Sequence, residues 1–242
     1  MNLSAQRQNW DLLASTDPLW AILTDPSKRN NGWSLDEFFA TGVGEIGAAL
    51  SLVESIHPLP SKHRALDFGC GVGRLTQALG DRFDEVCGVD ISPAMIDLAG
   101  KYNRHGDRCR FYLNSRSDLN IFPSKHFDFV YSCITLQHVE PRFAKLYIQE
   151  FIRVLAPGGI AVFQLPSRAP TLAVRYFLAQ HLIGAFLRRI RADYPILEMY
   201  GVKKEEVLRL LKRVGGQILD IRPDHSAGPQ WESYRYIVTR HP

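Results

Sequence analysis

A glycine-rich run and two acidic residues are the parts of this sequence whose types and spacing could do chemistry. The run reads Leu66-Asp67-Phe68-Gly69-Cys70-Gly71-Val72-Gly73, directly after a strand-like segment and at the start of a helix-compatible one. Glycines there let the backbone turn tightly and let a ligand lie against main-chain N–H groups, while the start of a helix presents unpaired donors. The run therefore predicts a ligand-binding turn.

Asp90 is the second part of this constellation, because it ends the next strand-like segment. A carboxylate there can accept hydrogen bonds from both ribose hydroxyls of a nucleotide-like ligand. Glycines alone are equally compatible with an ordinary turn, but strand, Asp-x-Gly-x-Gly-x-Gly, helix, strand and Asp together predict a nucleoside cofactor. NAD and ATP fit less well, because the dinucleotide fingerprint places its third glycine one residue later and no phosphate loop ending in Gly-Lys-Ser/Thr is present.

The elements that must position these residues follow from the apolar pattern after residue 64. Strand-like segments alternate with helical patterns, which predicts a parallel sheet covered on both faces. The segments are Ala65–Phe68, Val86–Asp90, Arg110–Leu113, Phe127–Tyr131 and Ile160–Leu165, with a helical pattern at Ala144–Leu155 ended by Pro157-Gly158-Gly159. An amphipathic helix at 203–214 and two strand candidates, Gln217–Ile221 and Tyr234–Thr239, follow.

Two further segments lie outside this alternation. Residues 1–63 are predicted to be a helical lead-in, with helix-compatible pieces at Leu35–Ala40 and Glu45–Ile56, and residues 166–202 to be an insertion over the carboxyl edge of the sheet. We expect a single domain over 1–242, with a core at 64–165 and closing elements at 203–242. The lead-in and the insertion would then choose the substrate.

Composition bounds the class of protein. Of 242 residues, 45 % are hydrophobic and 22 % are charged, close to the averages of soluble globular proteins. The formal net charge of +4 is not by itself a nucleic-acid signature. The four cysteines are too far apart for a CxxC metal or redox motif. The amino terminus lacks the apolar pattern of a secretory signal. The apolar stretch Thr171–Ile190 is interrupted by polar residues, which argues against a membrane span. We therefore expect a cytoplasmic protein with reduced cysteines and no membrane span.

The glycine-rich run resembles the first motif of the class I S-adenosylmethionine-dependent methyltransferases. Phe127–Ser132 is similar to the family's fourth strand, and Leu155–Ile160 to the turn into its fifth. The resemblance covers 64–165 closely and 200–240 more loosely. It implies S-adenosylmethionine as cofactor, S-adenosylhomocysteine as product, and an α/β fold with a three-layer, Rossmann-like, seven-stranded and mostly parallel sheet.

The resemblance also implies which residues contact the cofactor. Asp90 would bind the ribose diol, and Ile91 would lie beside the adenine. The methionine moiety would face Asp67, Gly69, Cys70, Gly71 and Gly73. Relatives often read the adenine with an acidic residue after the third strand, a position that Ser115 occupies here. The predicted set therefore also includes Asn114, Ser115 and Ser132, while Asp118 stays open as an adenine contact or a solvated loop carboxylate.

Candidates for a general base are needed only if the acceptor is a hydroxyl or a protonated amine. His138, after the fourth strand, could titrate near neutrality and accept a proton. We favour the other interpretation, in which His138 shapes its loop by hydrogen bonding to the backbone. Tyr200 and, in an expected hairpin loop, His225 are the other candidates. Some relatives carry glutamate at the position of Gln137 and bind a metal nearby, so glutamine here predicts no metal site.

The acceptor pocket is expected between the lead-in and the insertion, where aromatic side chains could wall an apolar or ring-bearing substrate. The candidates are Trp10, Trp20, Trp33, Phe38, Tyr176, His181, Tyr194 and Tyr200. We predict methyl transfer to oxygen or nitrogen of a small or medium-sized metabolite by in-line displacement. Two alternatives stay open: an RNA or protein methyltransferase docking through Arg188-Arg189-Ile190-Arg191, and a non-catalytic cofactor-binding partner. The oligomeric state is left undetermined.

Overall fold

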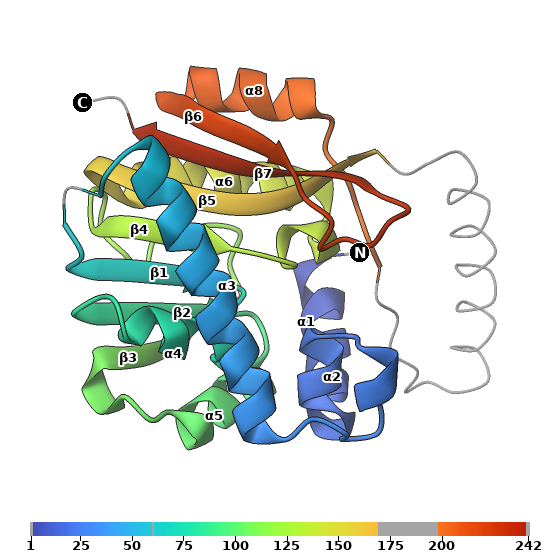
Figure 1. The fold of residues 1–242 in the computed structure, drawn as a ribbon. Coiled ribbons are helices and arrows are strands. Elements are labelled where there is room, and N and C mark those ends of the chain that lie inside the picture. The colour runs from blue at the N-terminus through green and yellow to red at the C-terminus, as the bar shows by residue number, and fades with distance from the viewer. Residues whose placement is uncertain (1, 60, 169–197, 241–242) are drawn as a thin grey trace.

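Residues 2–59, 61–168 and 198–240 are described by the computed structural model, and a seven-stranded sheet runs through them (Figure 1). The strands lie in the order β3-β2-β1-β4-β5-β7-β6. Their bounds are β1 Arg64–Phe68, β2 Glu85–Asp90, β3 Cys109–Leu113, β4 Phe127–Ser132, β5 Leu155–Arg168, β6 Gly216–Pro223 and β7 Glu232–Arg240. Strand β7 alone runs antiparallel to its neighbours, so the predicted α/β fold with a mostly parallel, seven-stranded sheet is confirmed.

Helices cover both faces and one edge of the sheet. Their bounds are α1 Leu3–Thr16, α2 Pro18–Ile22, α3 Leu35–Ile56, α4 Arg74–Gly80, α5 Pro93–Tyr102, α6 Pro141–Val154 and α8 Lys204–Arg213, with short 3-10 turns η1 Pro26–Lys28, η2 Gly106–Arg108 and η3 Leu136–His138. The strand order reverses between β1 and β4, and ligands of open α/β sheets bind at the carboxyl ends of strands at such a point. Helices α1 and α2 lie beside that edge (Figure 1).

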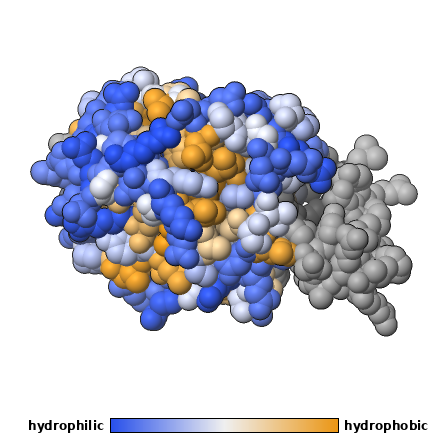
Figure 2. Space-filling model, turned by 90° about the horizontal axis from the view of Figure 1, so that it is seen from below, coloured by the Kyte–Doolittle hydropathy of each residue, from blue (hydrophilic) through white to orange (hydrophobic). Residues whose placement is uncertain are grey.

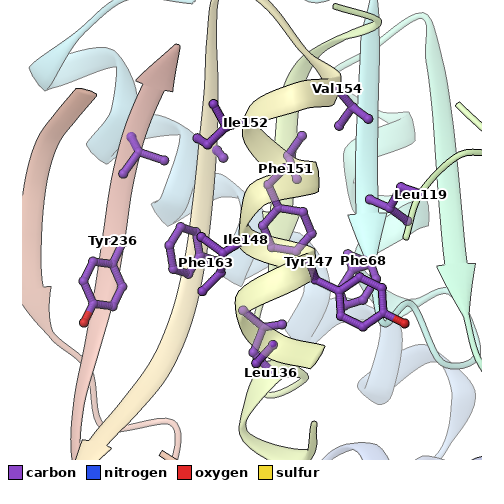
Figure 3. Close-up of a cluster of buried hydrophobic side chains, with 14 of the residues drawn as sticks. Phe68, Leu119, Leu136, Tyr147, Ile148, Phe151, Ile152, Val154, Phe163 and Tyr236 are labelled. Atoms are coloured by element: carbon purple, nitrogen blue, oxygen red, sulfur yellow. The ribbon is translucent and has the colours of Figure 1, made fainter. Parts of the chain in front are cut away.

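The larger buried cluster lies between the sheet and helices α6 and α8. Helix α6 presents Tyr147, Ile148, Phe151 and Ile152 to it, as the 3.6-residue period requires (Figure 3). Leu146, on the outer face of the same helix, is 41 % exposed. This face of the sheet therefore has a dry core that fixes the carboxyl ends of β1 and β4.

The opposite face is covered by α3 and α4, which approach each other closely at Gly42. A Cβ atom on Gly42 would lie 2.4 Å from the carbonyl oxygen of Arg74, so only glycine fits there. The two separate helical pieces predicted for this region were wrong. Leu35–Ile56 is one helix, begun by a capping box between Ser34 and Glu37, because packing on α4 overrides the weak helix propensity of its glycines.

Helix α3 is also, within the described ranges, the one helix long and apolar enough by composition to cross a membrane. Its residues Ile46, Leu50 and Val53 pack into the buried cluster on the sheet. The helix therefore has the packing of a core helix.

Several predicted boundaries move in the structure. Strand β5 begins at Leu155, ahead of the Pro-Gly-Gly turn, because Leu155 pairs with Phe127 across a register irregularity. It also continues to Arg168, past the predicted start of the insertion. Val202 donates its backbone N–H to the carbonyl of Pro166 at 2.9 Å, so the described ends of the insertion lie together. Residues 169–197, and with them Tyr176, His181, Tyr194 and the basic cluster at 188–191, lie outside the described residues.

The face on the side of β3 and α5 mixes polar residues with apolar ones near its middle (Figure 2). Leu113, at the end of edge strand β3, is among the more exposed large apolar side chains of the described chain. The cavity described next opens instead at the carboxyl edge.

Candidate active site

The turn after β1 brings its backbone against the end of β4. Gly69 has a φ of +79°, and a Cβ atom on it would lie 2.1 Å from the Thr135 methyl carbon, so both conformation and space require glycine. The backbone N–H groups of Gly69 and Cys70 both donate to the carbonyl of Val89, at 2.8 and 3.0 Å. These bonds hold the turn against β2 and leave its outer surface facing the carboxyl edge.

Asp90 is held in place by the backbone on both sides. One carboxylate oxygen accepts the N–H of Gly71 at 2.9 Å, and the other accepts the N–H of Ser92 at 2.9 Å. Burial raises the pKa of the Asp90 carboxyl, while these backbone bonds act in the opposite direction. Each oxygen keeps a further lone pair, so the group can accept hydrogen bonds from a ligand diol.

A single cavity collects these groups, with about 900 Å³ of space that is partly open to solvent. We call one wall the loop side: it consists of Phe68, Gly69, Cys70, Gly71, Arg74, Leu75, Val89, Asp90, Ile91, Met95 and Asn114. We call the other wall the helix side: it consists of Leu3, Gln6, Trp10, Ala21, Ile22, Cys133, Ile134, Thr135, Val139 and Tyr147. Ligands of open α/β sheets bind at the carboxyl ends of the strands, so this cavity is the candidate site for a cofactor and a second molecule.

Six of the predicted cofactor residues line this cavity together: Gly69, Cys70, Gly71, Asp90, Ile91 and Asn114. Asn114 also shapes its own loop, because its amide donates to the carbonyl of Asp118 at 2.7 Å. Asp118 itself is paired with Arg116 at 3.4 Å, as the alternative of a loop carboxylate describes.

The other four predicted cofactor residues lie outside the cavity lining. Ser115 is exposed, Gly73 caps α4, and the hydroxyl of Ser132 donates to the carbonyl of Phe68 at 3.1 Å. Asp67 is buried beneath the glycine turn, where one oxygen accepts the Thr76 hydroxyl at 2.7 Å and the other has no partner. Burial raises the pKa of Asp67 to about 7. For these four residues, contact with the cofactor stays a prediction that the described geometry does not support.

The two general-base candidates also lie outside the lining. The ring nitrogens of His138 face the Gln137 amide at 3.2 Å and the carbonyl of Glu198 at 2.8 Å, and burial lowers the pKa of the ring. The hydroxyl of Tyr200 donates to the Glu198 carboxylate, and burial with that carboxylate raises its pKa. His225 is exposed in the β6–β7 loop, which lies at the carboxyl edge because Ser226 approaches Cys133.

Of the described aromatic residues that were predicted for the acceptor pocket, one lines the cavity and the others do not. Trp10 lines the cavity, whereas Phe38 is core, and the indole N–H groups of Trp20 and Trp33 donate to the carbonyls of Asp25 and Leu23. Sequence reasoning missed Tyr147, whose position on α6 carries a core pattern, and it missed the lead-in residues Leu3, Gln6 and Ile22. The amphipathic spacing of Leu3, Gln6 and Trp10 was the available signal.

The described residues hold no group of three or more His, Cys, Asp or Glu side chains that could bind a metal ion. The four cysteines are free thiols, and burial raises the pKa of the Cys133 thiol.

Comparison with known proteins assigns the family. Residues 65–159 match a family model described as a methyltransferase domain. A trans-aconitate 2-methyltransferase of Variovorax paradoxus is 29 % identical over 76 % of this chain and 64 % of that protein, so the chain spans less than two thirds of that relative. A ubiquinone biosynthesis O-methyltransferase of Coxiella burnetii is 30 % identical over 73 % of this chain and 72 % of that protein.

Solved structures are similar in fold. The magnesium protoporphyrin IX methyltransferase of Synechocystis PCC 6803, with bound S-adenosylhomocysteine, matches with a TM-score of 0.60 over 92 % of this chain and 93 % of that one, at 18 % identity. The cyclase SpnF matches with a TM-score of 0.64 over 98 % and 94 %, also at 18 % identity. A cyclase among these likenesses means that the fold alone does not set the reaction.

The chain belongs to the class I S-adenosylmethionine-dependent methyltransferases, as its likeness to the Coxiella protein and the matched domain establish. S-adenosylmethionine is the cofactor of this family. The described residues fit it, because the glycine turn borders the cavity and Asp90 offers an oriented carboxylate at the end of β2.

Proposed function

We propose that this protein transfers a methyl group from S-adenosylmethionine to an oxygen or nitrogen atom of a small or medium-sized metabolite. The observation that carries the proposal is that one cavity is lined both by the glycine turn with Asp90 and by side chains of α1, α2 and the segment after β4. The loop side would hold the cofactor, and the helix side would contact a second molecule.

The helix side supports an uncharged, largely apolar acceptor. Its polar side-chain groups are the Gln6 amide, the Trp10 indole N–H, the Thr135 hydroxyl, the Cys133 thiol and the Tyr147 hydroxyl, which donates to the carbonyl of Arg116. Among the described lining residues the one cation is Arg74, and its guanidinium is paired with Glu45 at 2.8 Å. A tricarboxylate such as trans-aconitate would need several unpaired cations, so a ring-bearing hydroxyl or amine fits the described lining better.

The protein's part in the reaction is orientation. Bound S-adenosylmethionine supplies an activated methyl group. Asp90 and the glycine turn would fix its orientation, while Trp10, Ile134 and Val139 would wall the acceptor and exclude water. In-line alignment is a large contribution to such a displacement, so a general base is required only for a hydroxyl or protonated amine.

Calorimetric titration with S-adenosylmethionine and S-adenosylhomocysteine tests the first half of the proposal. Turnover of the labelled cofactor with a panel of phenols, aromatic amines and polycarboxylates tests the second half. We expect both cofactor forms to bind and turnover to be confined to the uncharged acceptors. Binding of neither form would overturn the proposal as a whole, and turnover with polycarboxylates alone would overturn the assignment of an uncharged acceptor.

The alternatives from the sequence are distinguished by the same experiments. Docking of RNA or a protein through 188–191 involves residues outside the described ranges, and it would be indicated by activity on macromolecules only. Cofactor binding without turnover across the whole panel would favour a non-catalytic partner. A cytoplasmic location is part of the proposal, to be tested by cell fractionation.

A further inference from the structure

A row of hydrogen bonds through two buried glutamines and the partly buried His138 joins the cavity wall to the end of the insertion. The backbone N–H of Ile134 donates to the Gln164 side-chain oxygen at 3.2 Å, and the Gln164 amide nitrogen lies 3.2 Å from the Gln137 oxygen. The Gln137 amide nitrogen lies 3.2 Å from His138 Nε2, and His138 Nδ1 lies 2.8 Å from the carbonyl oxygen of Glu198. Gln137 and Gln164 are almost fully buried, which makes satisfied bonding obligatory.

The two ends of this row fix the direction of every bond within it. A backbone N–H can only donate, so Gln164 turns its oxygen to Ile134 and its NH₂ to Gln137 and to the Ser233 hydroxyl, 2.7 Å away. Gln137 must then accept with its oxygen and donate its NH₂ to His138 Nε2. A backbone carbonyl can only accept, so Glu198 requires a hydrogen on Nδ1. Both ends assign the same state to His138: neutral, with its hydrogen on Nδ1.

This state leaves His138 without a lone pair to act as a base. Nδ1 carries the hydrogen, and the Nε2 lone pair already accepts from Gln137. The ring is held by burial, and Trp10 packs edge-on against it with ring centroids 5.5 Å apart. The imidazole of His138, in η3, therefore contacts both α1 and the segment 198–200 and connects the three.

The segments that the His138 ring connects form part of the cavity wall. Ile134 lines the cavity with a φ of +57°, which is a strained conformation for a β-branched residue. Its bond to Gln164 fixes that conformation. At the other end, Tyr200 donates its N–H to the carbonyl of Gln137 at 2.7 Å. This backbone bond and the bond from the His138 ring to the Glu198 carbonyl dock 198–200 beside η3.

We propose that His138 is a positioning residue, not a general base: as the neutral Nδ1–H tautomer in the Gln164–Gln137–His138 row, it holds 198–200 and Trp10 against the end of β4 and so shapes the acceptor wall. The part that concerns the acceptor rests on the proposed function. The part that concerns the tautomer rests on the hydrogen bonds alone.

Isosteric substitution separates the two roles. In His138→Asn the side-chain NH₂ stands near the former Nδ1 position and can still donate to Glu198, but no basic nitrogen remains. We expect His138→Asn to keep kcat within about fivefold, and His138→Leu to raise the acceptor KM about tenfold or more with an unchanged affinity for S-adenosylhomocysteine. A general base would instead cost about 10²–10⁴ in kcat in both variants. That result would overturn the proposal.

Nitrogen NMR of the histidine rings tests the tautomer without any acceptor. Within the described ranges, the titratable groups of the segment that His138 contacts are the Glu198 carboxylate and the Tyr200 hydroxyl, which are bonded to each other, and Glu140 lies near Tyr200. We expect the Nδ1–H neutral form throughout pH 6–8. Gln137→Glu replaces the donor that faces Nε2 with a carboxylate, so it should raise the pKa of His138 and produce the imidazolium. An Nε2–H tautomer or an imidazolium in the unmodified protein would overturn the assignment, whatever the outcome of the activity tests.

Discussion

The carboxylate of Asp90 accepts a hydrogen bond from the backbone N–H of Gly71, 2.9 Å away, and so ties the end of β2 to the glycine turn after β1. The same carboxylate accepts the N–H of Ser92. One acidic side chain therefore both shapes the turn and lines the cavity. This relationship makes Asp90 the first residue to test.

Asp90→Asn should weaken S-adenosylhomocysteine binding by about 10–100-fold, because hydrogen bonds to a charged group contribute about 1.5–3 kcal/mol. Isothermal titration calorimetry measures the loss. Asp118→Asn is the matched control, since that carboxylate is paired with Arg116 on a neighbouring loop. Equal losses in both variants would contradict the assignment of Asp90 to the ribose.

Gly69→Ala should destabilise the protein more than Gly106→Ala. Both glycines have positive φ, at +79° and +55°, so both substitutions carry a conformational cost of about 1–2 kcal/mol. Only at Gly69 would the new Cβ collide, with the Thr135 methyl carbon, whereas Gly106 has open space. Urea unfolding compares the two. Equal free-energy losses would mean that the turn and the end of β4 are not in contact.

The buried Asp67 should make stability fall as pH rises from about 4 to about 7. Its pKa is about 7 in the folded protein, against 3.8 when exposed, so the folded state retains a proton that the unfolded state has released. Each unit of this pKa difference corresponds to about 1.4 kcal/mol. Asp67→Asn cannot ionise and should lose this part of the slope in unfolding free energy against pH. An unchanged slope in the variant would contradict the raised pKa.

Phe151→Ala should cost about 3–5 kcal/mol of unfolding free energy, because the ring is fully buried between α6 and the sheet. Leu146→Ala, on the exposed side of the same helix, should stay within about 0.5 kcal/mol. Chemical denaturation of the two variants checks which face of α6 is inside. Similar costs would contradict the packing in Figure 3.

Local sequence pattern predicted the frame of this protein well. The glycine turn, Asp90 and the order of strands and helices were readable, because turn residues and hydrophobic periodicity act over a few neighbouring positions. The same locality explains the errors. Helix α3 was divided at its glycines, because only its contact with Arg74 shows why Gly42 is tolerated. Contact of Asp67 with the cofactor stays a prediction, and only the tertiary structure shows that its carboxylate accepts the Thr76 hydroxyl.

The sequence by itself determined the family, the cofactor turn and the sheet that carries it. Only the tertiary structure decided what surrounds that turn: that α1 and α2 wall the cavity, and that His138 has both nitrogens occupied. The partners in the hydrogen-bonded row come from the segment after β4, including η3, and from β5 and β7, with Gln164 separated from Gln137 by 27 residues and from Ser233 by 69. Strand register brings them together, and register is a property of the whole sheet that no short segment encodes.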